Sequence, residues 1–277
     1  MKDNLYIYIP TRGRLEKQAT LKKIPEKWIP YTRLVVGEEE ADSHIEKYGK
    51  ELIMISPIEG LSAKRQWIME NAHSRYLLFL DDDLRFYTRN GNTSIASTED
   101  DMNDLFNLIF YWISDLKYAH AGLSSKSHQF HYICETKEEQ NPKNYIEIGK
   151  MWAAYGYNVD IFEKENIKFD RLPLMQDFDV TLSLLERGYP NRITYKYAHD
   201  QVGGSGSPGG CAFYRTNKLM KETAYKLEKL HPGVVDVVLK TSKTKWKGLS
   251  SNTRVDVNIH WKNAYRKKIG NISGFLK

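Results

Sequence analysis

The chain has 277 residues, of which 41% are hydrophobic and 27% are charged, with a formal net charge of +6. These are values of an ordinary globular protein, so they argue against a disordered or fibrous chain. No apolar run is long enough for a membrane span and no secretory signal pattern is visible, so neither is expected. Cys134 and Cys211 are the only cysteines, so we expect no disulfide framework and a reducing, cytoplasmic setting.

The positive charge is concentrated in the last quarter of the chain. Residues 215–277 contain fifteen Lys and Arg against four Asp and Glu, a net charge of +11, so residues 1–214 carry −5. A basic quarter on an acidic body suits a polyanion partner. A solvated basic face that only aids solubility explains the same charge equally well.

Short apolar segments alternate in the first third of the chain with segments that can hold helices, an order typical of a parallel α/β sheet. We expect strands at residues 5–10, 33–37, 52–56 and 76–80. Thr11, Arg12, Gly13 and Arg14 follow the first strand. A glycine between two arginines at a strand end suits a phosphate or the edge of a nucleotide, although such turns are common.

A helix is expected over residues 62–72, with Ser62 as a possible N-cap. Lys64 and Arg65 lie in its first turn, where cations oppose the helix dipole. Helix stability therefore does not explain these two side chains. An anionic ligand does.

Three carboxylates, Asp81, Asp82 and Asp83, follow the apolar strand at residues 76–80. In an open α/β sheet, ligands bind outside the carboxyl ends of the strands, which is where these side chains are expected. Adjacent carboxylates repel one another, and burial against an apolar strand is costly unless cations or hydrogen bonds compensate. The pattern predicts a divalent metal.

The middle of the chain is less specific. Residues 85–98 are interpreted as a polar surface loop, and a helix with clear apolar spacing is expected from Thr98 to Leu116. A further helix begins at Gln176 with Asp177 and Asp179 in its first turn. Taken alone, these two carboxylates are explained by capping and by the helix dipole.

The last segments end a strand and begin the basic quarter. A short strand is expected to end at His199, and a glycine-rich stretch follows over residues 201–210, either a linker or a lid beside a site. Further on, Trp246 lies among several lysines. Aromatic residues among cations suit nucleic acid, because phosphates take the charge and exposed bases stack.

This order of motifs resembles the nucleotide-sugar glycosyltransferases of the GT-A fold, especially the inverting ones, over about residues 5–199. The resemblance rests on four features: Thr-Arg at the end of the first strand, a helix that begins with Gly-x-x-x-Lys-Arg, an apolar strand that leads into Asp-x-Asp, and a later helix that begins with Gln-Asp-x-Asp. The stretches IYIPTRGR, HDQVGGSGSPGG and VNIHWKNAYRKK also look like the TET-associated glycosyltransferases of phages, which glycosylate hydroxymethylated pyrimidines in DNA.

The resemblance implies an α/β chain of the GT-A (Rossmann-like) type, with a mixed, mainly parallel sheet flanked by helices and a basic C-terminal extension. Residues 1–214 form the catalytic domain, and residues 215–277 pack on the same domain and contact the acceptor. The donor is a nucleoside-diphosphate sugar, expected to be a UDP-sugar. Its implied site consists of Thr11, Arg12, Glu38, Lys64, Arg65, Asp81 and Asp82.

The resemblance also implies a metal and a base. Asp81, Asp83 and His199 hold Mn²⁺ or Mg²⁺, which neutralises the leaving diphosphate. Asp177 takes the proton of the acceptor hydroxyl, and in-line attack inverts the anomeric carbon. A glutamine replaces the usual Glu beside this aspartate, so Asp179 remains an alternative base.

The expected acceptor is 5-hydroxymethylcytosine or a related pyrimidine in phage DNA, flipped out of the duplex in the cytoplasm of an infected host. Candidate acceptor contacts are Trp152, Tyr155, Trp246, Trp261, Lys245 and Lys247. No obligate protein partner is expected. Three alternatives remain open: a glycosyltransferase acting on a glycan, lipid or protein, a nucleotidyltransferase, and a non-catalytic nucleic-acid-binding protein.

Overall fold

The computed structural model describes residues 2–91, 93–128, 144–202, 210–241 and 253–266. Within these residues, ten strands form one mixed sheet in the order β3-β2-β1-β4-β9-β7-β10-β5-β6, with β8 paired to β10. The strands β1 to β4, β7 and β10 run in one direction, whereas β9, β5 and β8 run opposite to them. The predicted α/β class with a mixed sheet is confirmed.

The strands of this sheet are β1 Lys2–Pro10, β2 Thr32–Gly37, β3 Ile53–Ser56, β4 Ser74–Leu80, β5 Leu84–Asn90, β6 Thr93–Ala96, β7 His120–Ser125, β8 Tyr145–Glu147, β9 Ala154–Asn158 and β10 Asn191–Gln201. The α-helices are α1 Glu38–Tyr48, α2 Leu61–Glu70, α3 Glu99–Ser114, α5 Val159–Glu165, α6 Gln176–Glu186 and α7 Asn217–Leu230. Short 3₁₀ turns are η1 Leu21–Lys23, η2 Glu26–Tyr31, η3 Lys50–Leu52, η4 Lys126–His128 and η6 Gly210–Phe213.

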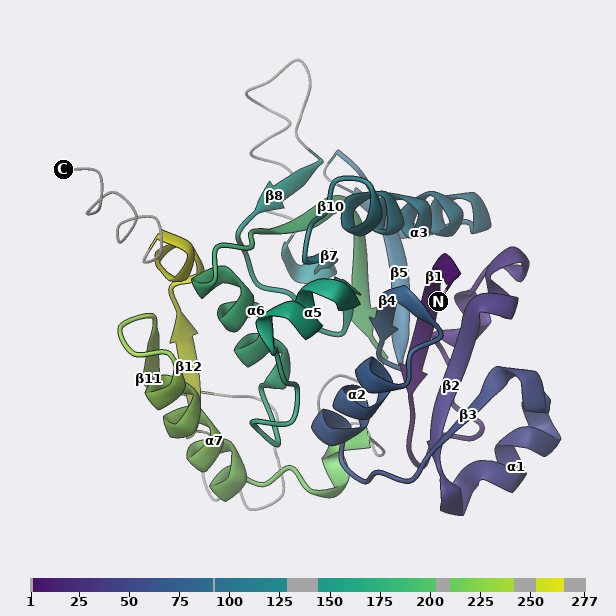
Figure 1. Ribbon diagram of the computed structural model, residues 1–277, viewed down its shortest axis with the longest axis horizontal. Coiled ribbons are helices and arrows are strands. Elements are labelled where there is room, and N and C mark those ends of the chain that lie inside the picture. The colour runs from purple at the N-terminus through teal and green to yellow at the C-terminus, as the bar shows by residue number, and fades with distance from the viewer. Residues whose placement is uncertain (1, 92, 129–143, 203–209, 242–252, 267–277) are drawn as a thin grey trace.

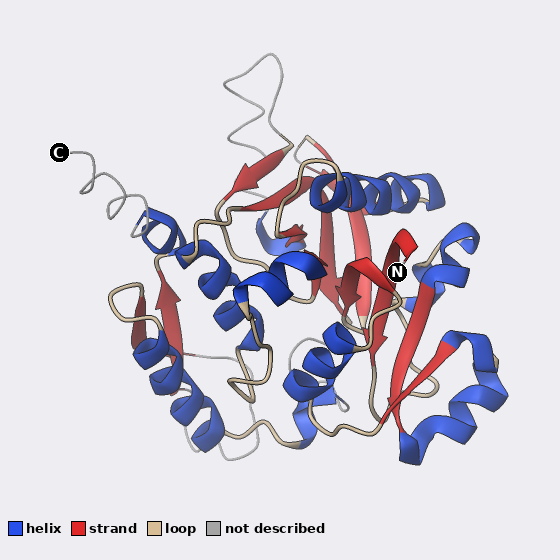
Figure 2. Cartoon of the chain, in the orientation of Figure 1, coloured by secondary structure: helices blue, strands red, loops and turns tan. Residues whose placement is uncertain are grey.

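Helices cover both faces of the sheet (Figures 1 and 2). The helix α3 packs on one face, whereas α2, α5 and α6 pack on the other. Side chains of a strand alternate between the two faces, and β4 does so, with Leu78 and Leu80 in the α3 core and Leu77 and Phe79 in the opposite core. This two-sided burial explains the unbroken apolar run of β4.

The C-terminal quarter builds a second, small sheet. Strands β11 Val235–Thr241 and β12 Thr253–Ile259 pair antiparallel, and α7 packs on them. A third apolar cluster joins this unit to α6 through Leu182, Leu185, Leu227, Val235 and Val257, all at most 9% exposed. In Figure 1 the unit lies at the end of the molecule away from β2 and β3.

Two local predictions are wrong. Residues 85–98 are not a loop: β5 and β6 form a hairpin, because the polar strand β5 buries Arg89, which donates to Ser124 Oγ and to Tyr195 O at 2.6 Å each. The N-cap of α2 is Gly60 rather than Ser62, and no side chain caps this helix.

No helix in the described residues is long and apolar enough to cross a membrane.

Candidate active site

A cavity of about 390 Å³ lies at the carboxyl ends of β1, β2 and β4, beside the first turns of α2 and α6. The strand ends contribute backbone and side chains that are adjacent because the three strands are parallel and neighbouring. The expected site residues on its wall are Thr11, Arg12, Glu38, Lys64, Arg65, Asp81, Asp82, Asp83, Trp152 and Asp177. Asp179, Tyr155, Trp261 and His199 do not line it.

Arg14 compensates two of the three consecutive carboxylates. It pairs with Asp82 and lies 2.9 Å from Asp83 Oδ2, and all three side chains are mostly buried. Thr11 Oγ1 donates to Asp82 Oδ2 at 2.6 Å. Burial nevertheless raises the pKa of Asp82 to about 6. Asp82 is therefore held mainly by protein groups, at the base of the cavity.

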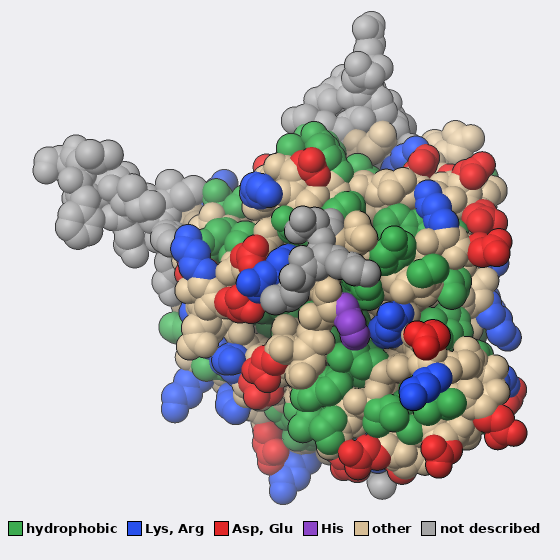
Figure 3. All heavy atoms as spheres, turned by 45° about the vertical axis from the view of Figure 1, so that its right-hand side comes forward, with side chains coloured by type: hydrophobic (Ala, Val, Ile, Leu, Met, Phe, Trp, Pro, Cys, Tyr) green, Lys and Arg blue, Asp and Glu red, His purple; other side chains and the backbone are tan. Residues whose placement is uncertain are grey.

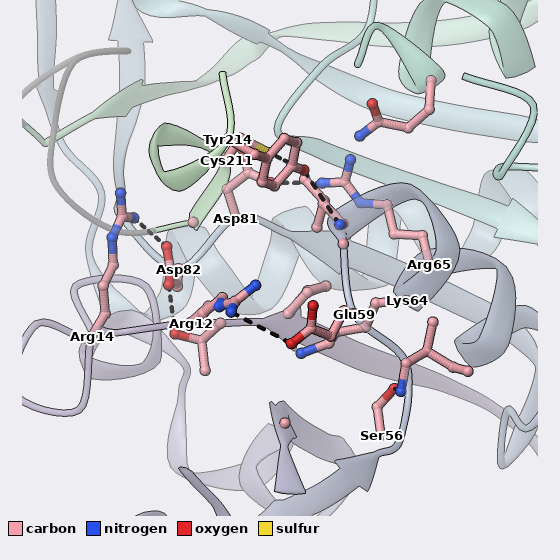
Figure 4. A pocket seen from close by; sticks show the side chains of 18 of the residues that line it. Arg12, Arg14, Ser56, Glu59, Lys64, Arg65, Asp81, Asp82, Cys211 and Tyr214 are labelled. Atoms are coloured by element: carbon pink, nitrogen blue, oxygen red, sulfur yellow. Dashed lines mark hydrogen bonds and ion pairs between the residues drawn. The ribbon is translucent and has the colours of Figure 1, made fainter. Parts of the chain in front are cut away.

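Arg65 is the partner of Asp81. Its Nη2 donates to Asp81 Oδ1 at 2.7 Å, and its guanidinium lies 5.3 Å from the ring centroid of Tyr155. Burial raises the pKa of Asp81 to about 7, although Arg65 opposes this shift. A protein carboxylate thus accounts for Arg65, which the sequence pattern attributed to an anionic ligand. Figure 4 shows this arginine pointing toward Asp81.

Lys64 is different from its neighbour. It is only 7% exposed, and burial lowers its pKa, an effect opposed by Glu39, Glu40 and Glu59. No ion pair joins Lys64 to another described residue within 4.0 Å. Nearby, Arg12 lies 3.6 Å from Glu59 at the mouth of the cavity. Buried cationic groups on a cavity wall suit an anionic ligand.

Two non-glycine residues of the wall have left-handed backbone conformations, Ala153 with φ 63° and Met175 with φ 57°. Such conformations cost about 1 to 3 kcal/mol and concentrate at functional sites. Met175 is the N-cap of α6, and its carbonyl accepts the amides of Phe178 and Asp179 at 3.1 Å. This turn brings Asp177 to the wall of the cavity. Burial raises the pKa of Asp177, and Arg65 opposes this shift.

Asp179 faces away from the cavity, two residues further along α6. It is fully buried, and its carboxylate accepts from Arg171 Nε at 2.9 Å and lies 2.8 Å from His231 Nε2. Burial favours the neutral acid, but the hydrogen bonds from His231 and Arg171 lower the pKa of Asp179. The alternative base is thus placed among structural partners, where it joins α6 to the C-terminal unit.

A hard divalent cation fits part of the carboxylate cluster. Asp81 and Asp83 both line the cavity, and Asp83 Oδ1 is buried without a hydrogen-bond partner among the described residues. Carboxylate oxygens are the ligands that Mg²⁺ and Mn²⁺ prefer. No group of three His, Cys, Asp or Glu side chains with metal-site geometry occurs in the described part of the chain. Asp81 and Asp83 are therefore the two described carboxylates on the cavity wall that fit such a cation.

A protein-family comparison decides the family. The model of the TET-Associated Glycosyltransferase family matches residues 5–210, about three quarters of the chain. The chain belongs to the TET-associated glycosyltransferase family. The family and the enzyme class predicted from the sequence are confirmed, and the match includes the three strand ends, α2 and α6.

Two curated relatives and two solved structures are also similar to this chain. The chain is 23% identical over 218 residues to the Beta-glucosyl-HMC-alpha-glucosyl-transferases of Enterobacteria phages T6 and T2, covering 76% of this chain and 75% of each relative. The S. aureus TarS fragment in complex with UDP-GlcNAc has a TM-score of 0.49 at 15% identity, over 81% of this chain and 66% of that one. The Pyrobaculum calidifontis mannosyltransferase PcManGT in complex with GDP-Man and Mn²⁺ has a TM-score of 0.49 at 13% identity. This match covers 73% of this chain and 58% of that one.

In this TET-associated glycosyltransferase, His199 lies near the end of β10. It is 1% exposed, its ring lies 5.4 Å from that of Trp152, and neither ring nitrogen has a hydrogen-bond partner among the described residues. Burial lowers the pKa of His199 to about 3, so its imidazole is neutral, the form that binds metals. Its predicted role as a metal ligand stays a prediction.

A second cavity of about 450 Å³ adjoins the first. The two share Trp152, Leu174, Met175, Asp177, Gln201 and Arg215. Trp152 and Trp261, two of the expected acceptor contacts, line the second cavity. Asp177 therefore lies in the wall between two spaces that are each large enough for a small ligand.

The other expected acceptor contacts are placed differently. Tyr155 is fully buried in the core of the glycosyltransferase, packed against Phe79 and Tyr157, so its ring supports Arg65 and does not face an acceptor. Side chains alternate between the two faces along a strand, and this alternation turns the side chain of Tyr155 in β9 into the helix-covered core. Lys245, Trp246 and Lys247 lie outside the described residues.

Several polar wall residues, among them the four described next, were not assigned from the sequence. Arg14 compensates the carboxylates, and a signal for it existed, since it stands in the Thr-Arg-Gly-Arg stretch. Gln201 Nε2 donates to Asp81 Oδ2 at 3.3 Å. Tyr214 OH accepts from the amide of Leu61 at 3.4 Å and lies 3.1 Å from Cys211 Sγ. No local pattern distinguishes these last residues.

Proposed function

We propose that the protein transfers a sugar from a nucleoside-diphosphate sugar, expected to be a UDP-sugar, to a hydroxyl of a modified pyrimidine in DNA. The observation that carries this proposal is the position of Asp177, whose side chain lines both cavities. A base that takes the acceptor proton must lie between donor and acceptor. The first cavity is assigned to the donor and the second to the acceptor.

The charges of the first cavity support its assignment to the donor. Lys64 is a cation on the cavity wall, and Arg12 lies at its mouth. Cations so placed suit the diphosphate, whereas Glu38, at the start of α1, offers an acceptor for the N–H groups of a nucleobase. Thr11 and Asp82, which hydrogen-bond to each other, form the floor beneath the nucleotide.

Asp81 and Asp83 are the residues that hold Mn²⁺ or Mg²⁺ in this proposal, with His199 as the expected third ligand. A divalent cation there supplies charge neutralisation to the leaving diphosphate. Asp83 Oδ1, buried and without a described partner, is the observation that supports this assignment. Asp81 shares its charge with Arg65 in the absence of a cation.

Asp177 acts as the base in this mechanism. Its carboxylate accepts the proton of the acceptor hydroxyl as the oxygen attacks the anomeric carbon of the donor. Burial raises its pKa, which brings its basicity closer to the working pH than that of an exposed aspartate. A single carboxylate between the cavities predicts attack from the face opposite the leaving group, and hence inversion.

The acceptor hydroxyl belongs to 5-hydroxymethylcytosine or to a sugar already attached to it. The phage T6 and T2 relatives carry the name Beta-glucosyl-HMC-alpha-glucosyl-transferase, so the hydroxyl of HMC and that of a glucosylated HMC are both candidates. The anomeric configuration of the product, compared with that of the donor, is a direct test of inversion. In this proposal the enzyme acts on phage DNA in the cytoplasm of an infected host.

The test is transfer of labelled sugar from a panel of UDP- and GDP-sugars to three matched duplexes. These contain cytosine, 5-hydroxymethylcytosine or β-glucosyl-5-hydroxymethylcytosine, and each is assayed with manganese and with a chelator. Metal-dependent labelling of a hydroxymethylated duplex, without labelling of the cytosine duplex, supports the proposal. Metal-dependent hydrolysis of a donor without labelled DNA moves the acceptor to a glycan, lipid or protein.

A further inference from the structure

The two halves of the second cavity come from different parts of the chain. One half belongs to the segment matched by the family and consists of Lys150, Trp152, Leu174, Met175, Asp177, Phe178 and Gln201. The other half follows residue 210, where the match ends, and consists of Arg215, Met220, Lys240, Arg254, Asp256, Val257, Asn258, Ile259 and Trp261. The acceptor side of this enzyme is therefore built largely by its C-terminal region.

The C-terminal half is held firmly against α6. Leu182 and Leu185 of the helix pack on Val235 and Val257 of the β11–β12 hairpin, in a cluster whose members are nearly inaccessible. Polar contacts add to this packing, since His231 Nε2 lies 2.8 Å from Asp179 Oδ1. Because Asp179 and Asp177 belong to the same turn of α6, the hairpin has a defined position relative to the base.

Cations predominate on the wall of the second cavity. Lys150, Arg215, Lys240 and Arg254 stand against two carboxylates, those of Asp177 and Asp256. Asp256 Oδ2 lies 3.1 Å from Arg254 Nη2 and 3.7 Å from Lys240 Nζ, so its charge is shared between two cations. The face in Figure 3, by contrast, carries Asp and Glu interspersed with Lys and Arg. A local excess of positive charge suits phosphates.

Aromatic rings complete the wall. Trp261 makes an edge contact with Phe178, with centroids 5.8 Å apart, and Lys150 Nζ lies 4.3 Å from the Trp152 centroid and 5.0 Å from that of Phe178. Rings of this kind stack on bases without regard to their identity. The volume of about 450 Å³ is within the range of small-molecule sites.

We infer that the second cavity receives one nucleotide of a polynucleotide acceptor, displaced from its stack, and that the C-terminal region selects this acceptor. Lys240 and Arg254 hold the flanking phosphates, Trp261 bounds the base, and Asp177 meets its hydroxyl. The inference rests on the proposed function, because it assigns the acceptor to the cavity beyond the base. It adds that the residues after the family match determine the class of acceptor.

The first experiment compares two double variants of the same charge. K240Q/R254Q removes two cavity cations, whereas K218Q/K221Q removes two exposed cations from α7 in the same C-terminal region. For each, DNA affinity is measured at several salt concentrations, together with donor affinity and transfer. We expect K240Q/R254Q to lose on the order of tenfold in DNA affinity per cation and to lower the salt slope by about two, with donor affinity unchanged.

The control variant K218Q/K221Q is expected to keep the DNA affinity and KM of the wild type to within about twofold. Equal losses in both double variants contradict the inference and assign DNA binding to a general basic face. Full DNA affinity in K240Q/R254Q also contradicts it. Thermal melting of both variants shows whether each is folded. A wild-type enzyme that labels no DNA with any donor refutes the proposed function, a distinct result.

A second measurement needs no variant. Displacing a base from a duplex costs less when that base is mispaired. The wild-type KM for a duplex with the target pyrimidine opposite a mismatch should therefore be severalfold lower than for the paired duplex. Equal KM values for the two duplexes contradict displacement of the nucleotide into the second cavity.

Discussion

The two cavities that share Asp177 are built in different ways. The first cavity, proposed for the donor, takes polar and charged groups from residues that directly follow strands, such as Thr11 after β1, Glu38 after β2 and Asp81 after β4. There, carboxylates and guanidinium groups compensate each other in buried pairs. The second cavity combines α6 and the segment before β9 with the β11–β12 hairpin, which comes much later in the chain. Its cations outnumber its carboxylates.

Because the two cavities are built differently, changes in them should have different effects. Parallel neighbouring strands place their ends together in any chain with this topology, so the first cavity, proposed for the donor, follows from the sheet. The second cavity, proposed for the acceptor, follows from how the C-terminal unit packs on α6. A change in the first cavity should therefore affect the donor, and a change in the second should affect the acceptor.

The largest effect on transfer is expected from a change at Asp177, in the wall between the two cavities. Asp177→Asn should lower transfer by about 10²- to 10⁴-fold, because the amide cannot take the hydroxyl proton, while donor affinity stays near that of the wild type. Turnover and donor titration measure the two quantities. Since burial raises the pKa of Asp177, the wild-type rate should fall with decreasing pH at a higher pH than for an exposed aspartate. Unchanged transfer in the variant excludes this base.

Asp83→Ala tests the donor cavity alone. The variant removes a carboxylate assigned to the metal and also removes the ion pair between Arg14 and Asp83, so donor affinity in the presence of manganese should fall by about 100-fold or more, and transfer with it. Calorimetric titration with the nucleotide sugar gives the affinity. Equal loss of donor binding in Asp83→Ala and Asp177→Asn overturns the division of roles between the two cavities.

Asp179→Asn should affect stability rather than chemistry. The buried carboxylate holds His231 and Arg171, and removing one partner of a buried charged group costs about 3 kcal/mol or more in free energy of unfolding. Urea denaturation of this variant and of Asp177→Asn gives a matched comparison. A loss of transfer with unchanged stability in Asp179→Asn would show that Asp179, and not Asp177, is the base.

The packing of the C-terminal unit should depend on pH through His231. Burial alone lowers its pKa, but hydrogen bonds with Asp179 and Glu186 raise it above the ordinary value. The folded pKa thus exceeds the unfolded value of about 6.5, so the stabilisation is complete below that pH and is lost as the pH rises through the folded pKa. Unfolding free energy at several pH values measures this loss.

The control for this titration is a histidine in the same unit. His231→Gln should remove the decline in stability with rising pH, whereas His260→Gln, at an exposed position beside Asp236, should leave the decline in place. If His260→Gln removes the decline in stability and His231→Gln keeps it, the decline comes from His260 and not from His231.

The smallest effect is expected at the floor of the donor cavity. Thr11→Val removes the hydrogen bond to Asp82 and leaves Arg14 as its main partner, so the free energy of unfolding should fall by about 1 kcal/mol and donor affinity by less than tenfold. Thermal melting and donor titration measure both. A loss as large as that of Asp83→Ala indicates direct contact between Thr11 and the donor.

Sequence patterns predicted many of the residues that line the first cavity. The apolar runs of β1 to β4 and the strand-end carboxylates were visible because period and position are local properties. The hairpin of β5 and β6 was missed because its polar residues find partners on other strands, as Arg89 does with Ser124 and Tyr195. Tyr155 was assigned to an acceptor because aromatic content does not reveal which face of a strand is buried.

The sequence by itself determined the α/β class, the family resemblance and the position of Asp81, Asp82 and Asp83 at the edge of a sheet. Only the tertiary structure decided that Asp177 lies between two cavities while Asp179, two residues away, is bound to His231. The physical reason is that strand and helix periods act over a few residues. The partner of a buried charge depends on which distant segment packs against it.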